Sequence, residues 1–189
     1  MLGSQLQDTP VMSLQTGQEL ARTSRPVIDP RILSIIAYQL EGPLLDNNPS
    51  LLRINDIREM SDIGMIIDSS DEILAADDVI KIKEVLDLNF DLVDMPVRDS
   101  RGRKVGRVSD YSLEADSFVI QQIVVKRPLI QSLNDSELLI GRSQIKEITD
   151  EMIIVETGEA KIEPTKQSAR HYSNPFRAAA PQASRGPST

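Results

Sequence analysis

The sequence predicts a mainly β protein with two small β-barrels in tandem, a short linking α-helix and a disordered C-terminal tail. Three observations support this fold class. A pattern of motifs occurs twice along the 189 residues. Aromatic residues make up only 3% and Trp is absent, so the core must consist of Ile, Val and Leu, which favour strands. From Glu159 onward the composition changes to Ala, Pro, Ser and Arg.

The internal repeat is the strongest of these signals, because its matches occur in order and at a nearly constant spacing. Small changes of spacing fall in loops, where duplicated structures tolerate them. The matches are Gly17, Leu20 and Ala21 with Gly102, Val105 and Gly106, and Ile35-Ile36 with Ile120-Gln121, at an offset of 85; Leu51 with Leu139 and Ile57 to Met60 with Ile145 to Ile148, at 88; and Met65 to Ile67 with Met152 to Ile154, at 87.

Each copy is predicted to consist of short strands separated by turns, which is typical of a small barrel. The residues 15–18 and 99–102 are expected to form hairpin turns in which Gly adopts a positive φ. Val108 interrupts the alternation of its strand and suggests a bulge. The expected strands are Ile32–Leu40, Lys104–Leu113, Phe118–Val125, Glu137–Ile140, Lys146–Ile148 and Met152–Glu156, with turns at Ser61–Gly64 and Arg142–Gln144.

A helix is predicted within Asp71–Leu86, between the two copies. Ser69 and Glu72 have the spacing of a capping box. An apolar stripe at helical spacing should pack across one barrel. Its members are Ala75, Val79, Ile82 and Leu86. The predicted organisation is a first repeat over 5–70, a linking helix over 71–88, a second repeat over 89–158 and a disordered tail over 159–189.

The two copies resemble the PRC-barrel family. In each copy a turn glycine is followed three residues later by an apolar residue and then by a small one, and further along by an Ile-x-Glu-Ile or Ile-x-Glu-Met step before an apolar hairpin. The family includes the cytoplasmic domain of the photosynthetic reaction-centre H subunit and the C-terminal domain of the ribosome maturation factor RimM. The resemblance implies a docking module for protein or ribonucleoprotein partners, and it supplies no catalytic residues.

Composition argues against several functional classes. The net charge is −8, and because the tail carries +3, the residues before it carry −11, which disfavours general binding to nucleic acid. The absence of Cys excludes disulfides and thiolate chemistry. The single His, His171, lies in the expected disordered tail, where it cannot be held as a general base. We therefore expect no catalytic centre, metal site or cofactor.

Two candidate binding segments remain. The first is a basic hairpin in the second copy, which could grip phosphate or RNA; the alternative is a solvated turn whose charges face the acidic body. It consists of Arg98, Arg101, Arg103, Lys104 and Arg107. The second is an aromatic segment of the tail, with Tyr172, Pro175 and Phe176, which is either a linear binding motif or incidental.

The sequence thus predicts a non-catalytic adaptor or scaffold that docks protein partners of unknown identity in the cytoplasm. The alternative is a ribosome- or RNA-associated assembly factor that uses the basic hairpin. The N-terminus does not have the pattern of a signal peptide, and no apolar run is long enough for membrane insertion. Self-association through exposed strand edges stays open.

Overall fold

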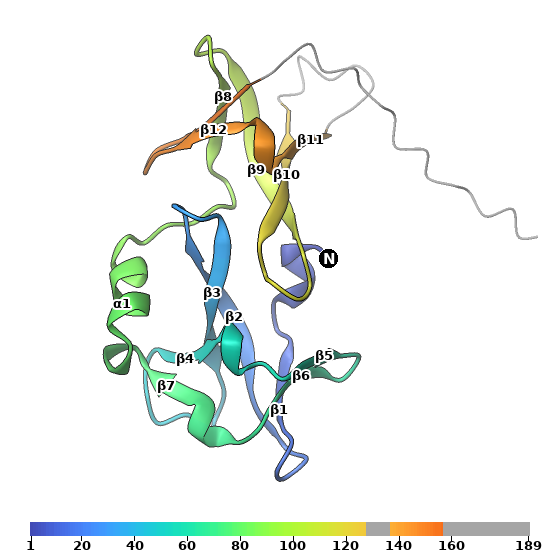
Figure 1. Cartoon of the computed structure of the whole chain (residues 1–189), viewed down its shortest axis with the longest axis vertical. Helices are drawn as coiled ribbons and strands as arrows, with labels where there is room; N and C mark the ends of the chain where they lie inside the picture. Colours follow the sequence, from blue (N-terminus) through green and yellow to red (C-terminus); the bar gives the residue numbers. More distant parts are fainter. Residues whose placement is uncertain (128–136, 157–189) are drawn as a thin grey trace, which may run out of the picture. The chain divides into compact units, whose positions relative to one another are not determined.

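The structure, a computed structural model, describes residues 1–127 and 137–156, which form two β-sheets and one α-helix (Figure 1). The mainly β class predicted from the sequence is confirmed. All of the described residues belong to one compact unit, Met1–Gly158. The aromatic residues predicted to form a tail motif, Tyr172, Pro175 and Phe176, lie outside the described residues, as does the expected disordered tail.

The first sheet has the strand order β5-β6-β1-β2-β3-β4-β7. Neighbouring strands pair antiparallel except β1 and β6, which are parallel. Register shifts within β2–β3 pairing mark bulges in the long second strand. The strands are β1 (Pro10–Ser13), β2 (Glu19–Asp29), β3 (Ser34–Glu41), β4 (Ser50–Arg53), β5 (Glu59–Ser61), β6 (Gly64–Ile67) and β7 (Ile73–Ala75).

The second sheet has the order β11-β10-β9-β8-β13-β12. Its one parallel pair is β8 with β13. The bulge expected at Val108 is present, because Val124 pairs with Asp110 whereas Val125 pairs with Val108. The strands are β8 (Pro96–Asp99), β9 (Lys104–Leu113), β10 (Ile120–Lys126), β11 (Glu137–Gly141), β12 (Ile145–Ile148) and β13 (Ile153–Val155).

The two sheets repeat one topology. Strands β1 to β6 and β8 to β13 have the same order and directions, and only β7 has no counterpart among the described strands. Gly17 and Gly102 both adopt positive φ, +69° and +78°, and a Cβ atom at either position would meet nothing within 4 Å. One expected match is wrong: Val11 pairs with Met65 and Val97 with Ile153, so the last strands correspond at an offset of 88, not 87.

The structure shows two sheets whose terminal strands, β5 and β7 in one and β11 and β12 in the other, are not hydrogen-bonded to each other within the described ranges. The closed barrels expected from the sequence are therefore not seen there. Side chains of both sheets are nonetheless buried together in one apolar cluster.

The helix is shorter than predicted. The helix α1 spans Ile80–Asp87, and the preceding residues form short 3-10 turns and the strand β7. The Ser69–Glu72 capping box does form, with Ser69 N–H donating to Glu72 Oε2 at 2.7 Å, but it caps a 3-10 turn. The sequence spacing predicts that residues 73–75 belong to the helix, but they form β7 and pair with β4. Without β7, β4 would be the edge of the sheet, and its free backbone groups provide hydrogen-bond partners for these residues.

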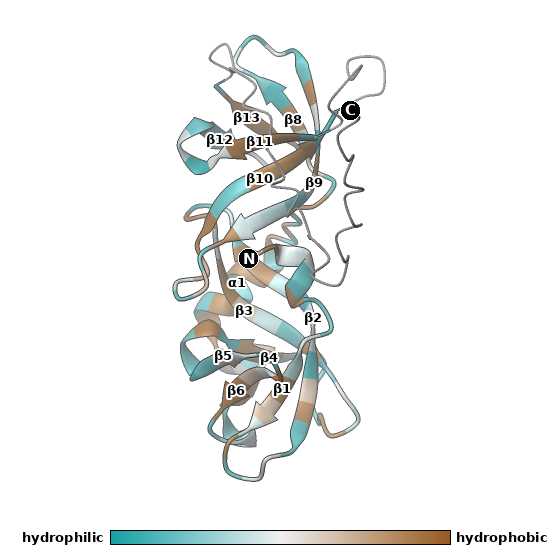
Figure 2. Ribbon diagram, turned by 90° about the vertical axis from the view of Figure 1, so that its right-hand side faces the viewer, coloured by the Kyte–Doolittle hydropathy of each residue, from teal (hydrophilic) through white to brown (hydrophobic). Residues whose placement is uncertain are grey.

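The apolar core has two parts. A large cluster includes residues of both repeats, among them Val11, Tyr38, Val97 and Ile123. A smaller cluster lies between α1 and the outer face of the first sheet. It consists of Val27, Ala37, Leu51, Ile82 and Val85. Figure 2 shows that hydrophobic residues are concentrated in the strands.

The two repeats meet in a reciprocal contact. Ile35 N–H donates to the Phe118 carbonyl at 3.1 Å, and Ile120 N–H donates to the Leu33 carbonyl at 2.9 Å. Both pairs are related by the offset of 85, and Ser34 forms an isolated antiparallel bridge with Val119 between them. Such an exchange of equivalent contacts is the signature of an isologous interface, here formed inside one chain.

Other contacts strengthen the link between the repeats. The Arg142 guanidinium donates from Nη1 to the Leu33 carbonyl at 3.0 Å and from Nη2 to the Ile32 carbonyl at 2.7 Å. The N-terminal residues also contact the second sheet, since the Met1 ammonium donates to the Leu113 carbonyl at 3.0 Å. Residues ahead of the predicted first repeat, 5–70, thus contribute to the contact with β9.

Tyr38 lies in the main core near this junction and is 1% exposed. Its hydroxyl is the one buried side-chain polar atom without a hydrogen-bond partner among the described residues. Burial raises the pKa of Tyr38 above its ordinary value. We expect Tyr38→Phe to stabilise the protein by about 1 kcal/mol, because a buried unpartnered hydroxyl costs folding free energy. Urea unfolding measures this change, and a loss of stability would contradict it.

Candidate functional site

The basic hairpin is formed by β8 and β9 and the turn between them. Arg98 pairs with Lys104, and the turn carries hydrophilic residues (Figure 2). Gly102 occupies the left-handed region at φ +78°, where L-residues other than Gly are strained. Its N–H donates to the Asp99 carbonyl at 2.9 Å, and Asp99 N–H donates to the Arg103 carbonyl at 2.9 Å. The tip of the hairpin is therefore a closed, hydrogen-bonded turn.

Asp99 anchors the turn from within. The residue is only 4% exposed, and its carboxylate accepts hydrogen bonds from Arg101 N–H at 2.9 Å and Arg103 N–H at 2.8 Å. Arg103 Nε donates to the second carboxylate oxygen at 2.6 Å. Burial alone raises the pKa of Asp99, but the hydrogen bonds from Arg103 and Arg101 outweigh it and hold the pKa below the ordinary value of an aspartate. The carboxylate is thus charged and fully engaged at neutral pH.

Three of the five predicted basic residues take part in the frame of the hairpin. Arg103 is bound to Asp99, and Arg98 Nη1 donates to the Gly102 carbonyl at 2.9 Å. Arg107 Nη1 donates to the Asp94 carbonyl at 2.6 Å. The first repeat has the same arrangement, in which Arg22 Nη1 donates to the Asp8 carbonyl at 2.9 Å, so Arg107 is a structural residue of the repeat.

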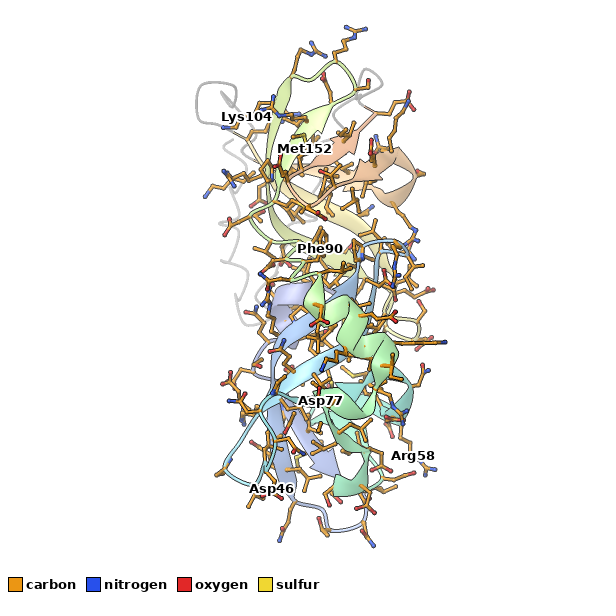
Figure 3. All side chains as sticks on the ribbon, turned by 90° about the vertical axis from the view of Figure 1, so that its left-hand side faces the viewer. Asp46, Arg58, Asp77, Phe90, Lys104 and Met152 are labelled. Atoms are coloured by element: carbon orange, nitrogen blue, oxygen red, sulfur yellow. The ribbon has the colours of Figure 1, made fainter. Side chains whose placement is uncertain are left out.

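Arg101 and Lys104 differ from the other three. Both are exposed, and neither side chain has a hydrogen bond or an ion pair within residues 1–127 and 137–156. Figure 3 labels Lys104 and shows nitrogen-bearing side chains extending outward from this end of the second sheet. The hairpin therefore presents two cations that are unpaired within the described ranges, and the turn beside them is held by Asp99.

The first repeat has a different turn at the same place. Ser13 replaces Asp99, and its hydroxyl accepts a hydrogen bond from Thr16 N–H at 3.3 Å. Gln15, Gln18 and Glu19 stand where the second repeat has basic residues. The positive charge is therefore a property of the second repeat and does not follow from the fold. The anchoring role of Asp99 was not predicted, although an Asp directly before a Gly-containing turn is a recognisable signal.

Other candidate positions are less suited to binding. A cavity of about 460 Å³ lies between α1 and the first sheet, but Arg31 and Arg53 on its rim are paired with Asp29 and Asp56. Among the described residues, no group of three or more His, Cys, Asp or Glu side chains could hold a metal ion. The predicted tail residues Tyr172, Pro175 and Phe176 and the single His171 fall outside the described ranges.

No protein-family model matches this chain, and a search of curated proteins returned no significant match. In the described part of the chain, no helix has the length and apolar character needed to cross a bilayer.

Proposed function

We propose that this chain is a non-catalytic adaptor that docks an acidic segment of a protein partner on the basic hairpin of its second repeat. The observation that carries the proposal is that Arg101 and Lys104, on and directly after a turn held by Asp99, have no partner for their charges in the part of the chain that the structure describes. A rigid turn binds with little loss of conformational entropy. We further propose that the duplicated unit is of the PRC-barrel type, on the strength of its repeated sequence motif; the repeated strand order supports the duplication itself.

The hairpin favours an acidic protein segment over RNA. Affinity for a nucleic-acid backbone grows with the number of phosphates neutralised, and two available cations supply few such contacts. The hairpin residues 96–107 include no aromatic side chain on which a base could stack. The chain is also acidic overall, at −8, which repels a polyanion more strongly than a short acidic peptide. RNA binding therefore serves as the alternative outcome of the test.

The test measures binding of a fluorescent poly-glutamate peptide to the full chain at low and at physiological ionic strength. We expect salt-dependent binding, and we expect Arg101→Glu with Lys104→Glu to weaken it by roughly tenfold or more, because two attractions become repulsions. Arg103→Glu is unsuitable, since it removes a ligand of Asp99 and loosens the turn itself.

The control matched in net charge is Arg58→Glu with Lys81→Glu, on the first repeat and on α1; Arg58, labelled in Figure 3, pairs with Asp68 at 2.9 Å, but both side chains are more than half exposed, so the loss of this pair costs little stability. An equal loss of affinity in the control would show a non-specific effect of net charge. Tighter binding of a poly-uridine oligonucleotide, lost in the hairpin variant, would replace the protein partner with RNA. No binding of the peptide at low ionic strength would reject the proposed site.

A further inference from the structure

The edge strand β11 of the second sheet occupies the same position as β4 in the first. Both pair antiparallel with the third strand of their repeat, β10 and β3. The registers match, since Leu51 pairs with Gln39 and Leu139 pairs with Val124, and both pairs are related by the offsets of the repeat. The two strands therefore present equivalent edges.

The two edges differ in what covers them. β7 pairs antiparallel with the far side of β4 and places Leu74 opposite Leu51. Among the described strands, β11 has no neighbour on that side. Burial differs accordingly: Leu51, which lies beneath α1 as well as beside β7, is fully buried, whereas Leu139, which has neither neighbour among the described residues, is 52% exposed. The strand β7 of the first repeat therefore shows how an added strand could pair with the edge of β11 in the second repeat.

Backbone groups on β11 are available for pairing. Gly141 N–H points away from β10, because it donates to the Gln144 side chain at 2.9 Å. Backbone groups of alternate residues in a strand point to the same side, so those of Leu139 also face the open edge. The pairing of β10 with β11 is regular over five residue pairs, and β11 contains no Pro or Lys that would blunt its edge.

The outer face of the second sheet argues against a helix as the occupant. In the first repeat α1 packs on Val27, Ala37 and Leu51. The residues at the first two positions in the second repeat are polar, Ser112 and Gln122. A helix laid on this face would bury polar side chains without an apolar stripe to match its own. An extended strand needs only the edge and one apolar contact.

We propose that β11 is a docking edge for an extended segment of a partner protein, which adds to the sheet as an antiparallel strand. In the proposed complex an aliphatic residue of the partner segment lies opposite Leu139, as Leu74 lies opposite Leu51 in the first repeat. A Lys or Arg two residues further along lies opposite Glu137, which is exposed and has no ion pair within the described residues. This site is separate from the basic hairpin, so either one can fail without the other.

The probe is a short synthetic peptide with alternating Thr, a central Leu and a Lys two residues after it. Binding to the full chain is followed by titration and by hydrogen exchange of assigned amides. We expect the Leu139 amide to become protected, and we expect Leu139→Lys to weaken binding at least tenfold without changing stability, because the residue is exposed. Ile63→Lys, at an aliphatic residue that is 64% exposed in the first repeat, is the matched control.

A second peptide, N-methylated at alternate residues, keeps the side chains but loses the backbone donors and should not bind. Several results would overturn the proposal: no binding of the first peptide, equal binding of the methylated one, or equal losses in Leu139→Lys and Ile63→Lys. Protection of the Leu139 amide in the free, dilute protein would mean that the chain already covers the edge. A concentration-dependent dimer abolished by Leu139→Lys would identify a second copy as the occupant.

Discussion

Gly106→Ala is expected to lower the free energy of unfolding by about 3 kcal/mol, at the upper end of the cost of overpacking a well-packed site. A Cβ atom at residue 106 would lie 2.2 Å from the Lys126 carbonyl oxygen and 2.7 Å from Val125 Cγ1. The first obstacle is backbone, so relief requires β9 and β10 to separate next to their Arg107–Lys126 pair. Urea unfolding monitored by circular dichroism measures the loss.

The first repeat shows that the requirement is for space and not for glycine at that position. Ala21 stands at the place equivalent to Gly106, and there Gly42, the residue directly after β3, approaches the Ala21 backbone closely. A Cβ at residue 42 would lie 3.2 Å from the Ala21 Cα. Each repeat thus has one glycine at this close approach, Gly106 within β9 and Gly42 directly after β3.

Gly102→Ala is the control for Gly106→Ala. Gly102 also lies in the basic hairpin, but a Cβ there meets nothing within 4 Å, so only the strain of φ +78° remains. That strain costs about 1–2 kcal/mol. Equal losses in the two variants would mean that the strands separate freely at residue 106, and the close approach would then have no role in stability.

Local patterns predicted much of the fold. The limits of β9, the bulge at Val108 and the turns at Gly17 and Gly102 depend on residues close in sequence, and all four are confirmed. The strand β7 was missed because its partner β4 lies twenty residues or more away, and no local period reports such a pairing. The register of β6 and β13 was off by one residue for a related reason: it is fixed by parallel pairing with β1 and β8.

The candidate site was predicted only in part. Counting charges identified the basic hairpin, but it could not separate Arg101 and Lys104 from the three arginines that hold the frame. That distinction depends on which carbonyl or carboxylate each guanidinium reaches, and Arg107 reaches a residue thirteen positions earlier. The comparison of Arg107 with Arg22 would have been available from the repeat, since both stand five residues after the turn glycine.

The junction between the repeats contradicts a simple reading of backbone preferences. Leu33 and Phe118 both have positive φ, 44° and 53°, although bulky residues avoid that region. Both side chains are nevertheless buried in the common core. The energy of burying these side chains, together with the reciprocal hydrogen bonds of their carbonyls, offsets the local strain. Sequence rules that assign positive φ to Gly or Asn could not find this contact.

Phe118→Ala is expected to destabilise the protein by about 4 kcal/mol, because it removes a fully packed aromatic ring and leaves a cavity. Phe118 is 3% exposed, and its ring meets the ring of Tyr38 edge-on with centroids 6.4 Å apart. Tyr38 belongs to the first repeat, so the lost contact weakens both repeats at once. Leu33→Ala, at the equivalent position, should act in the same direction with a smaller loss, since a smaller side chain is removed.

The shared core gives this prediction a second readout. Because residues of both sheets form one cluster, we expect one cooperative unfolding transition in the native protein and in Phe118→Ala. Amide exchange in β3 should accelerate as much as exchange in β10, although the substitution lies in the second repeat. Ile63→Ala, at an exposed residue, should change neither rate. Two transitions, of which only one moves in Phe118→Ala, would show that the repeats fold independently and that their reciprocal contact contributes little to stability.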